Sequence, residues 1–162
     1  MKEMIELSKK YCVEKHGDIK RKNGNLYYEH PIRVADMVSK YTDDSDVIIA
    51  SYLHDIFEHG SGDEKEILEI FNERVLGIIK ELTNDNEMIK IKGKFKYLIE
   101  KFNSLPAESL LIKLCDRYDN LIDSGSKPVY VIETGLLINF IDRPLTESHL
   151  SIIDLIKSIC DN

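Results

Sequence analysis

The chain has 162 residues, of which 43% are hydrophobic and 31% are charged, a balance typical of a soluble globular protein. No apolar run approaches the roughly 20 residues that a membrane-spanning helix needs, so we expect no membrane contact. A formal net charge of −7 would repel a phosphate backbone at long range, which disfavours a nucleic-acid partner. We therefore predict a single domain over residues 1–162 with its own core.

The first residues alternate charged and apolar side chains and lack the apolar core of a secretory signal, which predicts a cytoplasmic protein. The three cysteines are widely spaced and form no CxxC pair, which argues against a disulfide framework and against a thiolate zinc site. We expect Cys12, Cys115 and Cys160 to be small buried apolar residues.

The N-terminal part of the sequence predicts two helices joined by a loop. Apolar residues keep a helical spacing up to His16, and Gly17 ends the pattern. Residues 18–30 contain an Asn-Gly turn signal and three consecutive cations, which favours a loop. Because Pro31 suits the first position of a new helix, His30 is expected at a helix N-terminus.

The next predicted helix carries an adjacent His54-Asp55 pair within an apolar run. Residues 43–46 offer capping side chains, and the helix is expected to continue through the pair to a glycine-containing turn. At about 3.6 residues per turn, Glu58 would stack above His54, and His59 above Asp55. Burying an imidazole and a carboxylate is costly without compensation, so the pair requires either a bound cation or internal hydrogen bonding.

The rest of the sequence predicts further helices and no persuasive strand. A helix that begins after Pro106 carries Asp116 in an apolar run, with Asn120 four residues later on the same face. The predicted fold class is therefore all-α, a helical bundle of the non-coiled-coil type. Other helical segments are expected as two helices between 63 and 82, one amphipathic lysine-rich helix at 86–102, and further helices at 129–141 and 145–159.

Two imidazoles and two carboxylates stand out as a candidate set of metal ligands. Mixed nitrogen and oxygen donors suit Mn²⁺, Fe²⁺ or Zn²⁺ better than Ca²⁺. The four residues of the set are His30, His54, Asp55 and Asp116.

The order and spacing of these residues resemble the HD superfamily of metal-dependent phosphohydrolases. Within it, the chain looks most like the hydrolase domain of the RelA/SpoT alarmone enzymes and their small single-domain relatives. Four motifs in order carry the resemblance and cover most of residues 8–124. They are RKNGNLYYEHPIRVA at 21–35, LHDIFE at 53–58, LT at 82–83 and IKLCDRYDNL at 112–121.

The resemblance implies that the four candidate ligands bind one ion, with Mn²⁺ the usual family metal. Glu58 matches the first acid of a Glu-Asp pair that works beside the metal-bound water, whereas His59 stands where the close relatives have Asp. As a neutral imidazole His59 could accept a proton, and as an imidazolium it could hold a phosphate. We therefore predict Glu58 and His59 as catalytic residues. The resemblance also assigns Arg21 and Lys22 to the lining of a nucleotide pocket and Asn120 to a nucleotide contact.

In these relatives the reaction removes pyrophosphate from the 3′ position of guanosine tetra- or pentaphosphate. The implied function is a metal-dependent nucleotide pyrophosphohydrolase, and 162 residues leave no room for the synthetase that long relatives append. Two alternatives stay open. The chain could hydrolyse another phosphoester, such as a nucleoside monophosphate or NADPH, or it could be a non-catalytic nucleotide-binding regulator. The sequence carries no signal for oligomeric state.

Overall fold

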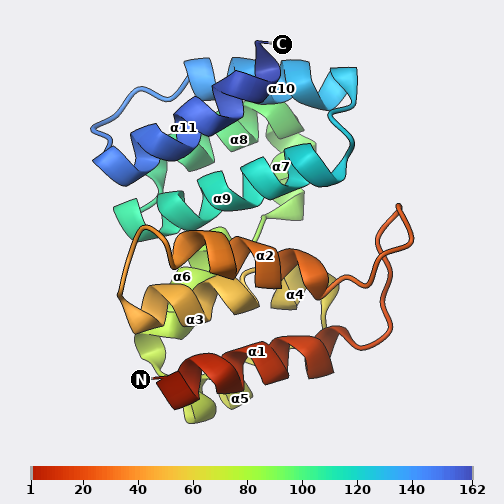
Figure 1. Cartoon of the computed structure of the whole chain (residues 1–162), viewed down its shortest axis with the longest axis vertical. Coiled ribbons are helices and arrows are strands. Elements are labelled where there is room, and N and C mark those ends of the chain that lie inside the picture. Colours follow the sequence, from red (N-terminus) through yellow and green to blue (C-terminus); the bar gives the residue numbers. More distant parts are fainter. Residues whose placement is uncertain (1, 162) are drawn as a thin grey trace. The chain divides into compact units, whose positions relative to one another are not determined.

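The computed structural model describes residues 2–161, which fold into helices joined by turns and loops (Figure 1). Among these residues the β-structure is limited to an isolated antiparallel bridge between Lys20 and Leu26, so the all-α prediction is confirmed. The helices are α1 (Lys2–His16), α2 (Glu29–Val38), α3 (Ser45–Leu53), α4 (Ile56–His59), α5 (Glu64–Ile70), α6 (Glu73–Leu82), α7 (Asn86–Lys92), α8 (Lys94–Ser104), α9 (Ala107–Asp123), α10 (Pro128–Asn139) and α11 (Glu147–Cys160).

The chain divides into two compact units, Met1–Thr83 and Asn84–Asn162. The expectation of a single domain over residues 1–162 stays a prediction, because compactness does not decide whether each unit folds alone. None of the helices within residues 2–161 combines the length and the apolar character needed to cross a bilayer.

The first unit is built around α3. This helix packs against α1, α2 and α6, and its residues 47–53 are all buried. A helix that is apolar on every side requires such all-round cover. Asp44 caps its first turn by accepting a hydrogen bond from the backbone N–H of Asp46 at 3.0 Å, as the capping side chains predict. The start of α2 and the end of α3, where His30 and His54 lie, are therefore held in place by this packing.

The prediction of one unbroken helix through His54 and Asp55 is wrong. α3 ends at Leu53, Asp55 has φ −100° and ψ 3°, and α4 begins at the next residue. The hydroxyl of Ser51 donates to the carbonyl of Val47 at 2.6 Å, a contact that bends helices. The Nδ1 of His54 also bonds the Ser51 carbonyl at 2.8 Å, where it competes for the acceptor that Asp55 N–H would use in a helix. The His-Asp pair thus lies in a break between two helices.

The turn after α4 contains two glycines at positions where a side chain would be too close to neighbouring atoms. A Cβ atom on Gly60 would lie 2.9 Å from the carbonyl oxygen of Ile56, and one on Gly62 would lie 2.7 Å from Ile56 Cγ1. Between them, the N–H of Ser61 donates to the carbonyl of Lys15 at 3.0 Å. The turn predicted after the His-Asp pair is therefore confirmed, and it is fastened to the end of α1.

The second unit is built around α9. This helix packs against α10 and α11, and most of its residues are buried. The single helix predicted at 86–102 is wrong, because Gly93 divides it into α7 and α8. Gly93 has φ 82°, a backbone conformation that favours glycine, and its N–H closes α7 on the carbonyl of Ile89 at 2.9 Å. The helical spacing of the sequence continues across this glycine and so conceals the break.

Candidate metal centre

In the first unit the carboxylate of Asp55 lies between two histidines. Its Oδ1 is 3.5 Å from Nε2 of His54, and its Oδ2 is 3.6 Å from Nε2 of His30. The hydroxyl of Tyr27 donates a hydrogen bond to the same Oδ2 at 2.8 Å. Two ring nitrogens and one carboxylate are thus brought together from the start of α2 and the break after α3.

A backbone contact sets the tautomer of His54. A carbonyl oxygen only accepts, so the 2.8 Å contact between Nδ1 and the carbonyl of Ser51 requires Nδ1 to carry the proton. In the neutral imidazole the lone pair is then on Nε2, the atom that faces Asp55. Metal-binding histidines are commonly oriented by this kind of second hydrogen bond.

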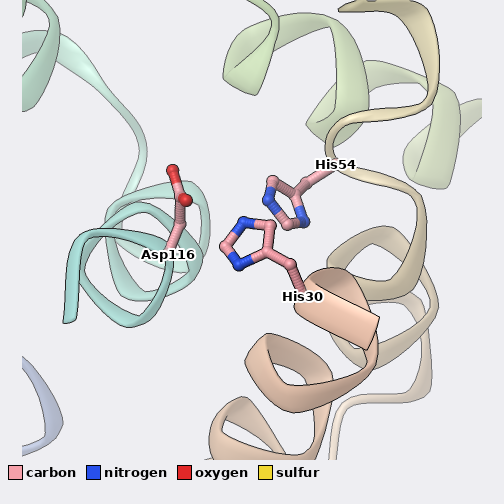
Figure 2. A group of neighbouring side chains, drawn as sticks. All are labelled: His30, His54 and Asp116. Atoms are coloured by element: carbon pink, nitrogen blue, oxygen red, sulfur yellow. The ribbon is translucent and has the colours of Figure 1, made fainter. Parts of the chain in front are cut away.

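His30 and His54 form an edge-to-face pair, with ring centroids 5.3 Å apart and planes at 71° (Figure 2). One ring nitrogen of His30 lies within 4.8 Å of one ring nitrogen of His54. His30 is 0% exposed and His54 is 1% exposed. With Asp55 they supply buried nitrogen and oxygen donors, the ligand types that a first-row divalent ion prefers. The residues of this unit therefore fit such an ion.

Two of the cysteines are buried next to candidate ligands in the sequence or the fold. Burial, with a further contribution from the charge of Asp55, raises the pKa of Cys12 to about 12. Burial, together with the charge of Asp116, also raises the pKa of Cys115. Both thiols are therefore protonated at neutral pH in the metal-free chain. The prediction that these two cysteines are buried is confirmed, while Cys160 is intermediate.

The short helix α4 carries both predicted catalytic residues. Glu58 is half-buried and His59 is exposed. The ring of His59 lies 4.8 Å from that of Tyr27, with the planes tilted by 33°. His59 therefore contacts the residue that hydrogen-bonds Asp55, and the catalytic roles of Glu58 and His59 stay predictions.

The two predicted pocket cations lie in the loop between α1 and α2, which extends away from the helices in Figure 1. The Arg21 guanidinium lies 5.3 Å from the centre of the Tyr27 ring, and Lys22 is exposed. The Arg21 N–H donates to the carbonyl of Asn25 at 2.9 Å, which closes the loop on itself. Arg21 is thus placed near the residue that bonds Asp55, whereas Lys22 is an exposed side chain of the same loop.

In the second unit, Asp116 projects from the middle of α9, as predicted (Figure 2). It is 7% exposed, and its Oδ2 lies 2.9 Å from the ammonium of Lys113. Asn120 donates to Oδ1 from one turn further along, which confirms that the two side chains share a face. Asp116 is therefore a buried carboxylate that is held on both oxygens by its own helix.

A further network fixes α9 against α10. Arg117 donates to Glu133 at 2.7 Å and to the hydroxyl of Thr134 at 3.0 Å, and its guanidinium lies 4.3 Å from the centre of the Tyr130 ring. These contacts leave little freedom for the helix that carries Asp116.

Three residues of functional interest received no role from the sequence. Tyr27 and Lys113 stand inside the motifs that carry the resemblance, but nothing in their spacing says that each contacts a candidate ligand. Ser51 lies one turn before Asp55, and its effect on the helix and on His54 becomes visible only with coordinates.

Comparison with known proteins places the chain in a class. The HD domain family matches residues 9–128, which is most of the sequence. The chain therefore belongs to the HD domain family, in agreement with the resemblance seen in the sequence.

Two relatives are enzymes named for one reaction. The guanosine-3′,5′-bis(diphosphate) 3′-pyrophosphohydrolase of Aquifex aeolicus is 36% identical over 122 residues, which are 74% of this chain and 17% of that protein. The enzyme of the same name from Drosophila melanogaster, MESH1, is 31% identical over 117 residues, which are 70% of this chain and 65% of that protein. The chain thus spans only a small part of the Aquifex relative.

Two solved structures share the fold. One is a metazoan orthologue of SpoT that hydrolyses ppGpp, with a TM-score of 0.78 and 22% identity over 96% of this chain and 94% of that one. The other is lmo0812 from Listeria monocytogenes, with a TM-score of 0.65 and 20% identity over 82% of this chain and 99% of that one. At these identities the likeness concerns the fold.

Proposed function

We propose that this chain is a divalent-metal-dependent phosphohydrolase that removes the 3′-pyrophosphate of guanosine 3′,5′-bis(diphosphate). The observation that carries the proposal is the set of donors around Asp55, with Nε2 of His54 and of His30 at 3.5 Å and 3.6 Å. Membership of the HD domain family supports the metal, and the relatives named for this reaction support the substrate. The proposed ion is Mn²⁺, with Fe²⁺ or Zn²⁺ compatible with the same donors.

Asp116 is the proposed fourth ligand. It is the acid of the IKLCDRYDNL motif, and it is a buried carboxylate in an otherwise apolar stretch of helix. Its two oxygens accept from Lys113 and Asn120, and a carboxylate oxygen can accept more than one contact, so the group is also suited to bind an ion.

When bound, a divalent ion would lower the pKa of a coordinated water and polarise a phosphoryl oxygen. The chain's own groups then have two tasks. Glu58, three residues after Asp55 and half-buried, is the proposed group that holds or accepts a proton beside the reacting water. His59, which is exposed on the same short helix, is the proposed second proton carrier.

The proposed substrate contacts come from the loop before α2 and from α9. Arg21 and Lys22 supply localised positive charge in a protein of net charge −7, as a polyphosphate requires. Asn120 is the proposed nucleotide contact. Its amide is oriented by the hydrogen bond that it donates to Asp116 on the same helix. The proposed metal ligand Asp116 and the proposed substrate contact Asn120 would therefore be joined by this hydrogen bond.

A second candidate function is hydrolysis of another phosphoester, such as a nucleoside monophosphate or NADPH. The observation in its favour is His59, a group able to become a cation at the position where the motif of the alarmone hydrolases has an acid. The substitution His59→Asp separates the candidates. It should maintain or improve ppGpp hydrolysis if ppGpp is the substrate, and should lower turnover of the other compound if the site is adapted to that compound.

The direct test is a screen of nucleotides with added Mn²⁺ and separate assays for pyrophosphate and orthophosphate. We expect pyrophosphate from ppGpp, loss of that release with a chelator, and no turnover by Asp55→Asn. Asp154→Asn, a change at an exposed acid of α11, is the matched control and should behave as wild type. Orthophosphate from another nucleotide would support the second candidate. Release of neither product with any divalent metal would overturn both.

A further inference from the structure

Tyr27 connects the loop before α2 to the His-Asp turn. Its hydroxyl donates to Oδ2 of Asp55 at 2.8 Å, the oxygen that also lies 3.6 Å from Nε2 of His30. The other oxygen, Oδ1, faces Nε2 of His54. Because the terminal torsion of an aspartate is broad, a hydrogen bond to one named oxygen decides which oxygen faces which histidine.

The ring of Tyr27 is itself held by two imidazoles. It lies parallel to His16, with centroids 5.2 Å apart and 6° between the planes, and it lies 4.8 Å from His59. His16 is 1% exposed at the end of α1, and its Nδ1 donates to the carbonyl of Cys12 at 2.9 Å. The phenol is therefore fixed by a rigid buried neighbour and by an exposed one.

The turn after α4 lies beside the imidazole of His16. A Cβ atom on Gly60 would lie 3.5 Å from its Nε2, so the turn after α4 packs against the edge of the imidazole. The end of α1, the loop tyrosine and the turn that follows Asp55 thus meet at one place in the first unit.

We infer that Tyr27 is a positioning residue of the proposed metal centre. It orients the carboxylate of Asp55 so that its oxygens are already arranged for an ion, and His16 and His59 hold the phenol in place. This inference rests on the proposed function, because it takes Asp55 as a metal ligand. Hydrogen-bond partners of metal ligands commonly contribute about 10-fold to 100-fold in metal affinity.

The test is calorimetric titration of the metal-free chain with Mn²⁺ for wild type and Tyr27→Phe, which removes the hydroxyl and keeps the ring. We expect the dissociation constant to rise about 10-fold or more in Tyr27→Phe. Tyr11→Phe is the matched control, since its hydroxyl also donates to a carboxylate, that of Glu66, at 2.7 Å. This control should bind Mn²⁺ as wild type does.

Two further measurements separate positioning from a purely structural role. The Mn²⁺ concentration for half-maximal hydrolysis should rise in Tyr27→Phe, while kcat at saturating Mn²⁺ stays near the wild-type value. His59→Leu, which removes one ring neighbour of Tyr27 from an exposed position, should weaken Mn²⁺ binding in the same direction by a smaller factor.

The outcomes are distinct. Wild-type Mn²⁺ affinity in Tyr27→Phe would overturn the inference, whether or not that variant is less stable without metal, and would leave the metal centre standing. Absence of Mn²⁺ and Zn²⁺ binding to the wild type would overturn the metal centre, and the inference with it.

Discussion

The ammonium of Lys113 lies 2.9 Å from Oδ2 of Asp116, one turn away on α9. The two side chains are 9% and 10% exposed, so both charges are largely removed from water. A buried charge that loses its partner is strongly destabilising, because its desolvation is no longer compensated. Lys113 therefore helps to compensate the burial of the Asp116 charge in the absence of a metal.

Replacing Lys113 with Met should lower the free energy of unfolding of the metal-free chain by about 3 kcal/mol. Urea denaturation in the presence of a chelator measures this change. Lys157→Met, at an exposed lysine on α11, is the control and should stay within about 0.5 kcal/mol of wild type. Equal effects of the two substitutions would show that the buried ion pair contributes no more than a surface lysine.

Removing the proposed ligands should abolish stabilisation by metal. An ion that binds only the folded chain stabilises it by about 2.7 kcal/mol at 100 times its dissociation constant. Thermal unfolding with chelator and with Mn²⁺ should therefore give two different Tm values for wild type. The two values should coincide for each ligand replaced by Ala. These substitutions are His30→Ala, His54→Ala, Asp55→Ala and Asp116→Ala. A full metal-dependent rise in Tm for Asp116→Ala would remove that residue from the proposed centre.

Neutralising the loop cations should weaken substrate binding more than folding. Arg21→Gln and Lys22→Gln should each raise KM several-fold, since a charge-assisted phosphate contact contributes roughly 1.5 to 3 kcal/mol before solvent screening at an exposed site. Added salt should act in the same direction. Steady-state kinetics with ppGpp measures the effect, and Lys10→Gln, at an exposed lysine of α1, is the control. Wild-type KM values in both variants would show that Arg21 and Lys22 are solvated loop residues that do not bind the substrate.

His149 should make the second unit less stable in acid. Its Nδ1 accepts from the N–H of Thr146 at 3.1 Å and its Nε2 lies 2.9 Å from the carbonyl of Ala107, so the folded chain holds the neutral imidazole. Burial is the main cause that lowers the pKa of His149. Because the folded pKa is below the unfolded value of about 6.5, the contribution is present above pH 6.5 and is lost as pH falls through the folded pKa.

Denaturation curves between pH 7 and pH 5 should therefore show a smaller loss of stability in His149→Gln than in wild type. Burial also lowers the pKa of His16, so part of the acid sensitivity should remain in the variant. A wild-type slope in His149→Gln would mean that protonation of this imidazole does not oppose folding.

The helices could be predicted from the sequence because their signals are local. The end of α1 at His16 and the cap of α3 at Asp44 follow from residues within one turn. The break at Gly93 was missed since the apolar spacing does not change there. The break at Asp55 was missed because it depends on side-chain contacts to the backbone of α3.

The candidate ligands could be identified from residue type and order, but not the groups that orient them. Asp55 and His54 stand next to each other in the sequence, whereas Tyr27 is 28 residues from the aspartate that it bonds. Such a contact depends on how a loop packs against a turn, and this packing cannot be predicted from a local sequence pattern. The family motif includes Tyr27 and Lys113 without saying what each one touches.

The close approach of Gly62 to Ile56 links the two positions in sequence variation. A methyl group at residue 62 would meet two carbons of the fully buried Ile56 at 2.7 Å and 2.9 Å, so Gly62→Ala alone forces that side chain to move. Shortening residue 56 to Ala would make space for it because both contacted γ carbons are then removed, whereas Val keeps two γ carbons. Sequences that descend from this one should therefore change the two positions together, and a chain that carries Ala at 62 should have a residue without γ carbons directly after its His-Asp pair.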